Sequence, residues 1–193
     1  MRNQSIRYLI VPGWRGSPDD HWQSHWQRTL PNSSRVEQQD WSAPRLEDWV
    51  NELQRSVAAS GGPIVLVAHS LGCITVAHWA VQAPVELLGR VRGALLVAPA
   101  DVERSNCPEP LRNFAPIPRQ PLPFASQLVG SDNDTAASAA RAVEMGRDWG
   151  SEVAILPGAG HINVASGHHQ WEQGFANLYR LQSRIERNAR RWA

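Results

Sequence analysis

The chain has 193 residues, of which 19 are basic and 18 acidic, so its formal charge at pH 7 is +1. This length fits one domain, 1–193, with a substantial buried core. A charge so close to zero gives no electrostatic basis for binding nucleic acid or a membrane surface. All 19 basic residues are arginine. The absence of lysine excludes a P-loop, a Schiff-base enzyme and a Ser-Lys dyad on this chain.

Two features of the sequence bear on the cellular compartment. Met1 is not followed by a charged and then apolar leader, and no apolar run reaches the length of a membrane span. Cys73 falls in a predicted buried helix and Cys107 in a proline-rich loop, which indicates free thiols in a reducing compartment rather than a disulfide framework. We therefore expect a cytoplasmic protein.

Short apolar runs alternate with helical patterns along the whole chain. Strands are expected at 6–11, 35–39, 64–68, 93–98, 124–130 and 153–156. Helices are expected at 21–30, 44–59, 71–83, 135–149 and 170–191, the first of them capped by Asp19 or Asp20. This alternation predicts a three-layer α/β/α sandwich around a mostly parallel sheet of six strands in the order 2-1-3-4-5-6.

Residues 101–123 interrupt this pattern with six prolines and no regular period. A loop of this length in a compact domain is usually functional. We expect it to cover a site at the carboxyl ends of the strands.

The sharpest signal is the corner between the third strand and the helix that follows it, where the sequence reads Ala68-His69-Ser70-Leu71-Gly72. A tight strand-to-helix turn lifts the Ser70 hydroxyl clear of the sheet, and it leaves the Leu71 amide at a helix N-terminus, where an oxyanion would form. The match is A-x-S-x-G rather than G-x-S-x-G, but alanine still lets strand and helix pass closely. The pattern predicts a nucleophilic serine.

A nucleophilic serine needs a histidine base and an acid that orients it, in the chain order Ser, acid, His. His161 follows the last strand after a glycine-rich turn and fits the base. Four other histidines fit less well because of where they fall: His168 and His169 lie nearer the last helix, His78 lies within the serine helix, and His69 is expected to point away.

The acid is less sharply defined by position. Asp132 and Asp134 end the fifth strand, and Asp101 follows the fourth. Topology favours the pair at 132–134, although Asp134 could simply cap the helix expected to begin at Thr135.

Five motifs together carry a family resemblance: Val11-Pro12-Gly13-Trp14, Asp20-His21-Trp22-Gln23, Ala68-His69-Ser70-Leu71-Gly72, Ser131-Asp132-Asn133-Asp134 and Gly160-His161-Ile162-Asn163, followed by Ser166-Gly167 and Trp171. Over nearly its whole length the chain resembles the compact serine hydrolases of the RBBP9/YdeN family. The resemblance implies a minimal α/β-hydrolase fold with Ser70 as nucleophile, Asp134 as acid and His161 as base. The chain departs from the family pattern at Ala68, where Gly is more frequent, and at Thr135, where Pro commonly follows the acid.

We therefore expect a serine hydrolase that cleaves a small-molecule carboxylic ester, thioester or amide through an acyl-enzyme. The amides of Leu71 and Trp14 are expected to form the oxyanion hole. No cofactor is implied, and no metal, since His21 and His25 share a helix face without a third ligand. Two alternatives stay open: an interaction module with vestigial activity, and an acyltransferase using the same residues.

Nine tryptophans are more than packing requires, and several fall in segments near Ser70. The expected substrate pocket is apolar with few charges, which suits a small neutral or aromatic acyl group. Its predicted lining is Trp14, His21, Trp22, Phe114 and Trp171. The alternative for the tryptophans is that they belong to the plain core.

Overall fold

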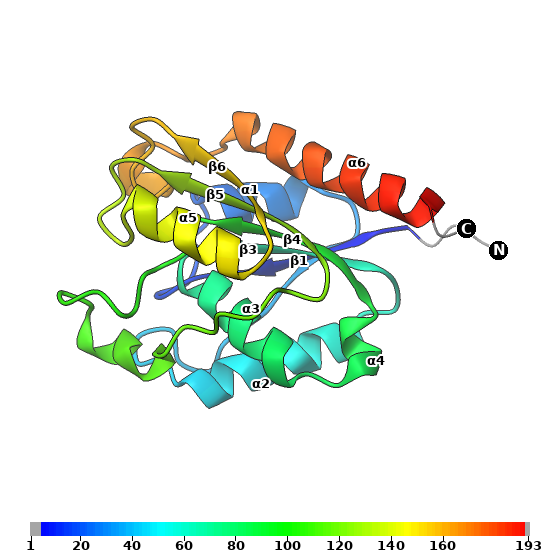
Figure 1. Cartoon of the computed structure of the whole chain (residues 1–193), viewed down its shortest axis with the longest axis horizontal. Helices are drawn as coiled ribbons and strands as arrows, with labels where there is room; N and C mark the ends of the chain where they lie inside the picture. Colours follow the sequence, from blue (N-terminus) through cyan, green and yellow to red (C-terminus); the bar gives the residue numbers. More distant parts are fainter. Residues whose placement is uncertain (1–4, 192–193) are drawn as a thin grey trace.

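The computed structural model describes residues 5–191, so the ends of the predicted domain, residues 1–4 and 192–193, lie outside it. Within this range six strands form one all-parallel sheet in the order β2-β1-β3-β4-β5-β6 (Figure 1). The strands are β1 (Arg7–Val11), β2 (Ser33–Arg35), β3 (Ile64–His69), β4 (Val91–Val97), β5 (Ala125–Ser131) and β6 (Glu152–Leu156). The predicted fold class and strand order are confirmed.

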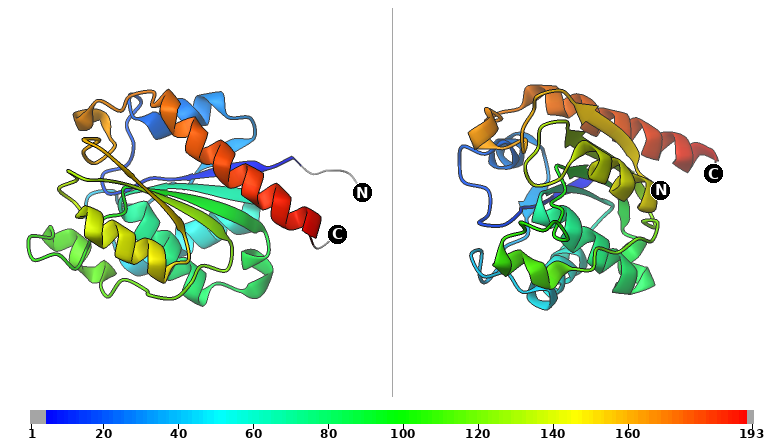
Figure 2. Two further views of the ribbon diagram at one scale, coloured as in Figure 1. Left: turned by 45° about the horizontal axis from the view of Figure 1, so that its top comes forward. Right: turned by 60° about the vertical axis from the view of Figure 1, so that its left-hand side comes forward.

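Helices cover both faces of the sheet, as Figures 1 and 2 show. One face carries α1 (Trp22–Thr29) and α6 (Phe175–Arg191). The other carries α2 (Leu46–Ala59), α3 (Leu71–Gln82) and α5 (Ala139–Asp148), with the short α4 (Val85–Leu88), which the sequence pattern did not predict. In the described range no helix is both long and apolar enough to cross a membrane.

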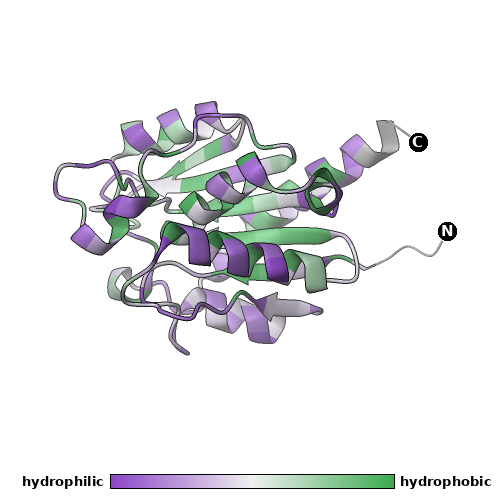
Figure 3. Ribbon diagram, turned by 90° about the horizontal axis from the view of Figure 1, so that it is seen from below, coloured by the Kyte–Doolittle hydropathy of each residue, from purple (hydrophilic) through white to green (hydrophobic). Residues whose placement is uncertain are grey.

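The central strand β3 contributes to both hydrophobic cores because successive side chains of a strand point to opposite faces. Val65 and Val67 pack in the core under α1 and α6, whereas Leu66 and Ala68 pack under α2 and α3. All four are fully buried. Figure 3 shows the consequence in the ribbon, with hydrophobic strands lying between helices that turn hydrophilic residues outward. Near-continuous burial of this kind is expected for a parallel sheet covered on both sides.

The second strand was predicted too late in the chain. We expected residues 35–39, but β2 runs Ser33–Arg35. Val36 still donates its backbone N–H to Ile10, and beyond it the chain leaves the sheet. Only one residue of 35–39 is strongly apolar, so β2, as an edge strand, has little to bury past that point.

The starts of two helices also differ from the prediction. α1 is capped by His21, whose Nδ1 accepts from the backbone N–H of Gln23, and not by Asp19 or Asp20. α5 begins four residues after Thr135, with Ser138 as its N-cap. Asp134 is therefore not the cap of this helix, which leaves its carboxylate available for another role.

The proline-rich segment 101–123 was expected to cover a site at the carboxyl ends of the strands, but none of its residues lines the cleft beside Ser70. It forms a 3₁₀ helix, Glu109–Phe114, and packs its apolar side chains into the core under α2 and α3. Phe114 is 0% exposed and meets Trp49 edge to face at 5.8 Å. His78 in α3 donates from Nε2 to the carbonyl of Phe114 at 2.8 Å, which fixes the segment to that helix.

The last predicted helix, 170–191, begins later and is preceded by two short 3₁₀ turns, Val164–Ser166 and Glu172–Gly174. Trp171 breaks the helical pattern because its backbone is left-handed, with φ 46°. The resulting segment between β6 and α6 lies against α1 (Figure 2), and it carries His161.

Candidate active site

Ser70 lies on the strained corner between β3 and α3. Its backbone has φ 55° and ψ −121°, a conformation that L-residues rarely adopt. The corner is tight because glycine occupies both contact points. A Cβ on Gly72 would lie 2.3 Å from the carbonyl oxygen of Val11, and one on Gly13 would lie 2.8 Å from the Ser70 Cβ. The loop after β1 is therefore pressed directly against the serine.

A continuous chain of hydrogen bonds joins three of the predicted residues. Ser70 Oγ lies 2.8 Å from His161 Nε2, and His161 Nδ1 lies 2.9 and 3.0 Å from the two carboxylate oxygens of Asp134. The Asp134 side chain is only 2% exposed, and its Oδ1 also accepts from the backbone N–H of Ala136. An imidazole whose Nδ1–H is held by a carboxylate presents a lone pair at Nε2, and that lone pair can take a proton from the serine.

The other acid candidates have different partners. Asp132 accepts from the backbone N–H of Gly158 at 2.7 Å and thus supports the turn before His161. Asp101 forms an ion pair with Arg141 at 3.3 Å.

The alternative histidines do not contact Ser70. His168 bonds Ser166, His169 bonds Asp20, and His78 bonds Phe114, as described above. His69 was expected to point away from the site, and this was wrong. Its Nε2 donates to the backbone carbonyl of His161 at 2.9 Å, and the two rings lie 4.9 Å apart.

The backbone amides of Leu71 and Trp14 belong to the two segments that meet at Ser70. Leu71 is the first residue of α3, and an ideal Cβ on Gly13 would lie 3.3 Å from the Leu71 nitrogen, so the loop carrying Trp14 borders that amide. Within residues 5–191 neither the Leu71 nor the Trp14 amide donates to a protein acceptor. Unpaired N–H groups at a helix N-terminus are suited to binding an oxyanion.

The cleft above Ser70 has a volume of about 390 Å³. Its lining comes from the loop after β1, the β3 corner and the segment after β6: Trp14, Gly16, Pro18, His21, His69, Ser70, His161, Asn163, Val164 and Ala165. None of these side chains is an acid, a lysine or an arginine, so the cleft is nearly free of formal charge.

Three residues of the predicted pocket lining lie elsewhere. Phe114 is in the core under α2 and α3, and Trp22 (0% exposed) and Trp171 (6%) are in the core under α1 and α6. Trp14 and His21 do line the cleft. The tryptophan count thus reflects packing more than substrate contact, because the aromatic rings of α1 pack against Trp171 and Phe175, in and just after the segment before α6.

Sequence reasoning missed His69 and residues 163–165 as lining of the cleft. For His69 a signal was present: it continues the Val65 and Val67 alternation and so faces α1 and the final loop. Residues 163–165 carry no such signal, since their position depends on the left-handed backbone of Ile162 (φ 47°) and on the turn that follows.

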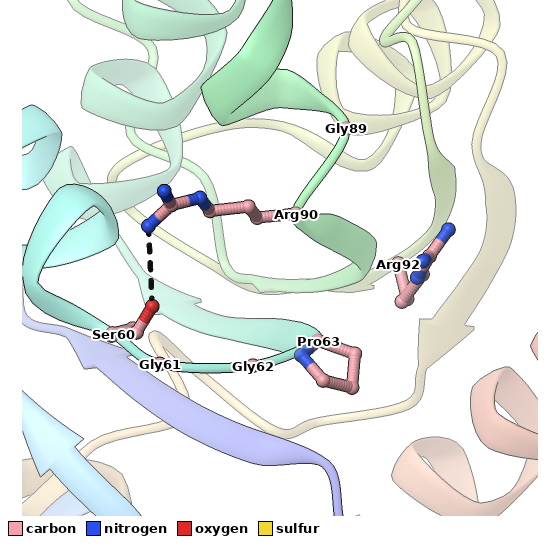
Figure 4. A pocket seen from close by; sticks show the side chains of 7 residues that line it. All are labelled: Ser60, Gly61, Gly62, Pro63, Gly89, Arg90 and Arg92. Carbon is pink, nitrogen blue, oxygen red and sulfur yellow. Dashed lines mark hydrogen bonds between the residues drawn. The ribbon is translucent and has the colours of Figure 1, made fainter. Parts of the chain in front are cut away.

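A second pocket lies at the opposite end of the strands from Ser70, where β3 and β4 begin (Figure 4). Arg90 spans it and donates to the backbone carbonyls of Ala58 and Ser60, at 2.9 and 3.3 Å, at the C-terminus of α2. Its guanidinium is thus used to satisfy helix carbonyls. Nowhere in 5–191 do three His, Cys, Asp or Glu side chains gather in a way that suits a metal ion.

The parallel sheet, the strained serine corner and its neighbours among solved structures define an α/β-hydrolase fold. The ydeN gene product of Bacillus subtilis is 18% identical, with a TM-score of 0.73 over 93% of this chain and 100% of that one. A thermophilic esterase of Thermogutta terrifontis is 13% identical, with a TM-score of 0.66 over 94% and 90%. At these identities the likeness concerns the fold alone.

The family is shown more directly. The family model described as "Serine hydrolase" matches residues 8–180, and the chain belongs to this family. A protein of Pectobacterium atrosepticum described as a YdeN-like hydrolase is 32% identical, with a TM-score of 0.81 over 93% of this chain and 92% of that one. Among curated proteins, none matches this chain.

Proposed function

We propose that this serine hydrolase cleaves a carboxylic ester, thioester or amide of a small neutral substrate through an acyl-enzyme. The observation that carries the proposal is the unbroken path from Ser70 Oγ through His161 to the buried Asp134 carboxylate, at 2.8 and 2.9 Å. A serine so paired can lose its proton as it attacks a carbonyl carbon.

The groups have distinct roles in the proposed reaction. Ser70 Oγ bonds to the carbonyl carbon while His161 Nε2 takes the hydroxyl proton, and the imidazolium then gives that proton to the leaving oxygen, sulfur or nitrogen. Water attacks the acyl-enzyme in the same way and releases the acid. Asp134 holds the imidazole in the Nδ1–H tautomer throughout. The amides of Leu71 and Trp14 stabilise the oxyanion; losing one such donor typically costs about 10²–10³ in kcat.

The nearly uncharged cleft supports a neutral acyl substrate, because a carboxylate or ammonium would lose its hydration there without gaining an opposite charge. The esterase of Thermogutta terrifontis is a distant neighbour in fold and is consistent with ester cleavage.

A fluorophosphonate probe tests the proposal because it phosphonylates only an activated serine. We expect folded wild-type protein to be labelled at Ser70, and neither heat-denatured protein nor the Ser70→Ala variant to be labelled. Turnover of short-chain aryl esters should fall by about 10⁶ in Ser70→Ala. An unlabelled Ser70 in folded protein would favour the interaction module, and acyl transfer to an added alcohol in preference to water would favour the acyltransferase.

A further inference from the structure

Two histidines that the proposed reaction does not use lie in the wall of the cleft next to Ser70. His21 is 4% exposed and His69 is 5% exposed, and both line the cleft. Their rings are 4.9 Å apart at an angle of 62°. A buried polar side chain normally has all its hydrogen-bonding groups satisfied, so the partners of the four ring nitrogens can be followed one by one.

The tautomer of His21 is fixed by the start of α1. Its Nδ1 accepts the backbone N–H of Gln23 at 3.2 Å, so the ring proton must be on Nε2. Burial, followed by the charges of Arg35 and His161, lowers the pKa of His21 from 6.5 to about 4. At neutral pH the ring is therefore uncharged and has one N–H donor left over.

The tautomer of His69 is fixed by the loop that carries His161. A carbonyl oxygen can only accept, so His69 Nε2 must donate in its 2.9 Å bond to the His161 carbonyl. Burial, followed by the neighbouring His161 and His21, holds the pKa of His69 well below 6.5. The ring is neutral, and its Nδ1 keeps a free lone pair.

The two leftover atoms are a donor, His21 Nε2–H, and an acceptor, His69 Nδ1. In the described part of the chain neither atom has a hydrogen-bond partner in the protein. Neither atom is fully buried either. Both therefore retain access to the cleft that their side chains line. The wall beside Ser70 thus presents one donor and one acceptor on two neutral rings whose centroids lie 4.9 Å apart.

We propose that His21 and His69 form a polar subsite that binds a neutral substrate group able both to accept and to donate a hydrogen bond, such as a hydroxyl or a primary carboxamide close to the scissile carbonyl. This inference rests on the proposed function, since it names the substrate class of the same cleft. An ammonium would meet the His21 N–H and a carboxylate would meet the His69 lone pair, so each charged group has one unfavourable contact. A plain alkyl group would leave both ring atoms unpaired.

Two pairs of esters that differ by one hydroxyl in place of a methyl test the subsite. Ethyl 3-hydroxybutyrate against ethyl 3-methylbutyrate places the difference in the acyl group, and 2-hydroxyethyl butyrate against propyl butyrate places it in the leaving group. We expect kcat/KM to favour the hydroxylated member of at least one pair by about tenfold or more, because a site built to bind a hydroxyl rejects an analogue that lacks it.

His21→Asn is the informative variant, since asparagine is a good N-cap for α1 but does not carry the imidazole Nε2–H. We expect the selectivity ratio to fall at least fivefold in His21→Asn. His25→Asn, on the same helix but outside the cleft, is the matched control and should keep the ratio. Equal rates within both wild-type pairs, or an unchanged ratio in His21→Asn, would overturn the subsite.

A binding measurement decides the same question without turnover. In Ser70→Ala, the imidazole ¹⁵N resonances of His21 and His69 should shift on titration with N-propyl-3-hydroxybutyramide or N-(2-hydroxyethyl)butyramide, and much less with N-propyl-3-methylbutyramide or N-propylbutyramide. Equal shifts with all four would reject the subsite even if the enzyme is inactive. An unlabelled Ser70 and no ester turnover would instead reject the proposed function, so the two failures are distinguishable.

Discussion

The indole Nε1 of Trp22 donates a 2.9 Å hydrogen bond to the backbone carbonyl of Ile162, 140 residues further along the chain. Ile162 directly follows His161 and has a left-handed backbone. Trp26, one turn later in α1, makes the equivalent bond to the carbonyl of Gln170 at 3.2 Å. Two tryptophans of one helix therefore hold the segment between β6 and α6 at two points, one of them directly after His161.

We expect Trp22→Phe to lower kcat more than Trp26→Phe at a similar loss of stability. Phenylalanine keeps much of the ring packing but has no N–H, so each variant should lose roughly 1–2 kcal/mol of unfolding free energy. Only the bond from Trp22 adjoins His161, the proposed base, and a small displacement of a base is costly in rate, so we expect about tenfold lower kcat. Urea unfolding and steady-state kinetics measure both quantities. Equal effects on kcat would show that the bond to Ile162 has no positioning role.

Substitution of the three candidate acids by asparagine should have different effects on kcat and on stability. Asp134→Asn should lower kcat by about 10⁴, because an amide in place of the carboxylate favours the wrong imidazole tautomer. Asp132→Asn still offers an oxygen to the Gly158 amide, so its kcat should stay within about tenfold of wild type. Asp101→Asn breaks the ion pair with Arg141 and should affect unfolding free energy more than rate. A larger loss of kcat at 132 or 101 would reassign the acid.

Trp14→Ala tests whether Trp14 acts as a wall of the cleft that contacts substrate or as a residue of the core. Trp14 is half-buried and lines the cleft, and its amide, the expected oxyanion donor, is retained in alanine. We expect kcat/KM to fall by at least about tenfold with a changed acyl-chain preference. The loss of unfolding free energy should stay below the roughly 3–5 kcal/mol of a fully buried aromatic. Trp49→Ala, in the core, is the comparison. Large destabilisation with unaltered preference would contradict the assignment.

The depressed pKa of His21 predicts a dependence of stability on pH. The folded pKa of about 4 lies below the ordinary value of 6.5, so between these values the unfolded chain binds more protons than the folded one. Stability from this group is fully present above pH 6.5 and is lost as the pH falls to 4. The difference between the two pKa values corresponds to about 3.5 kcal/mol at about 1.4 kcal/mol per pKa unit, and about 3 kcal/mol of this is lost between pH 7 and pH 4. We expect the unfolding free energy, measured in urea, to fall between pH 7 and pH 4 by that much less in His21→Asn than in the wild type. An equal fall in both proteins would contradict the depressed pKa of His21.

Glycine in place of alanine usually lowers the stability of a protein, but the strained corner at Ser70 predicts the opposite. At φ 55° and ψ −121° a side chain costs on the order of 1–3 kcal/mol, which glycine avoids. The unfolding free energy of Ser70→Gly should therefore be about 1 kcal/mol larger than that of Ser70→Ala, even after the greater entropy of unfolded glycine is taken into account. Chemical denaturation of the two inactive variants measures this directly. A less stable Ser70→Gly would mean that the corner stores no strain.

The order of the strands and the positions of Ser70, Asp134 and His161 could be predicted because each depends on local signals. Apolar runs mark the strands, and in parallel strands the residues that follow them meet at one edge. The choice of Asp134 over Asp132 did not come from local signals. Both follow β5, and only the fold around them turns one carboxylate toward His161 and the other toward the Gly158 amide.

The lining of the cleft could not be predicted in the same way, because it depends on which side of a backbone each ring faces. Trp22 and Trp171 belong to segments near the site, yet packing between α1 and the segment before α6 buries their rings. The place of Phe114 was decided by the 3₁₀ helix at Glu109–Phe114, which directs the proline-rich segment toward α3. Such choices follow from tertiary packing, which overrides local pattern.

The absence of side chains at Gly13 and Gly72 limits how this active site can be altered. A Cβ added at Gly72 would lie 2.3 Å from the Val11 carbonyl oxygen, and one added at Gly13 would lie 2.8 Å from the Ser70 Cβ. The serine corner and the loop that faces it therefore have no space for a side chain at either position. Side chains at these two positions would therefore push the loop after β1 away from the serine corner. Val164 and Ala165, which also line the cleft, belong to a short 3₁₀ turn that carries none of the residues proposed to react. Substitutions at this turn are therefore a route to larger or smaller substrates that leaves the serine corner unaltered.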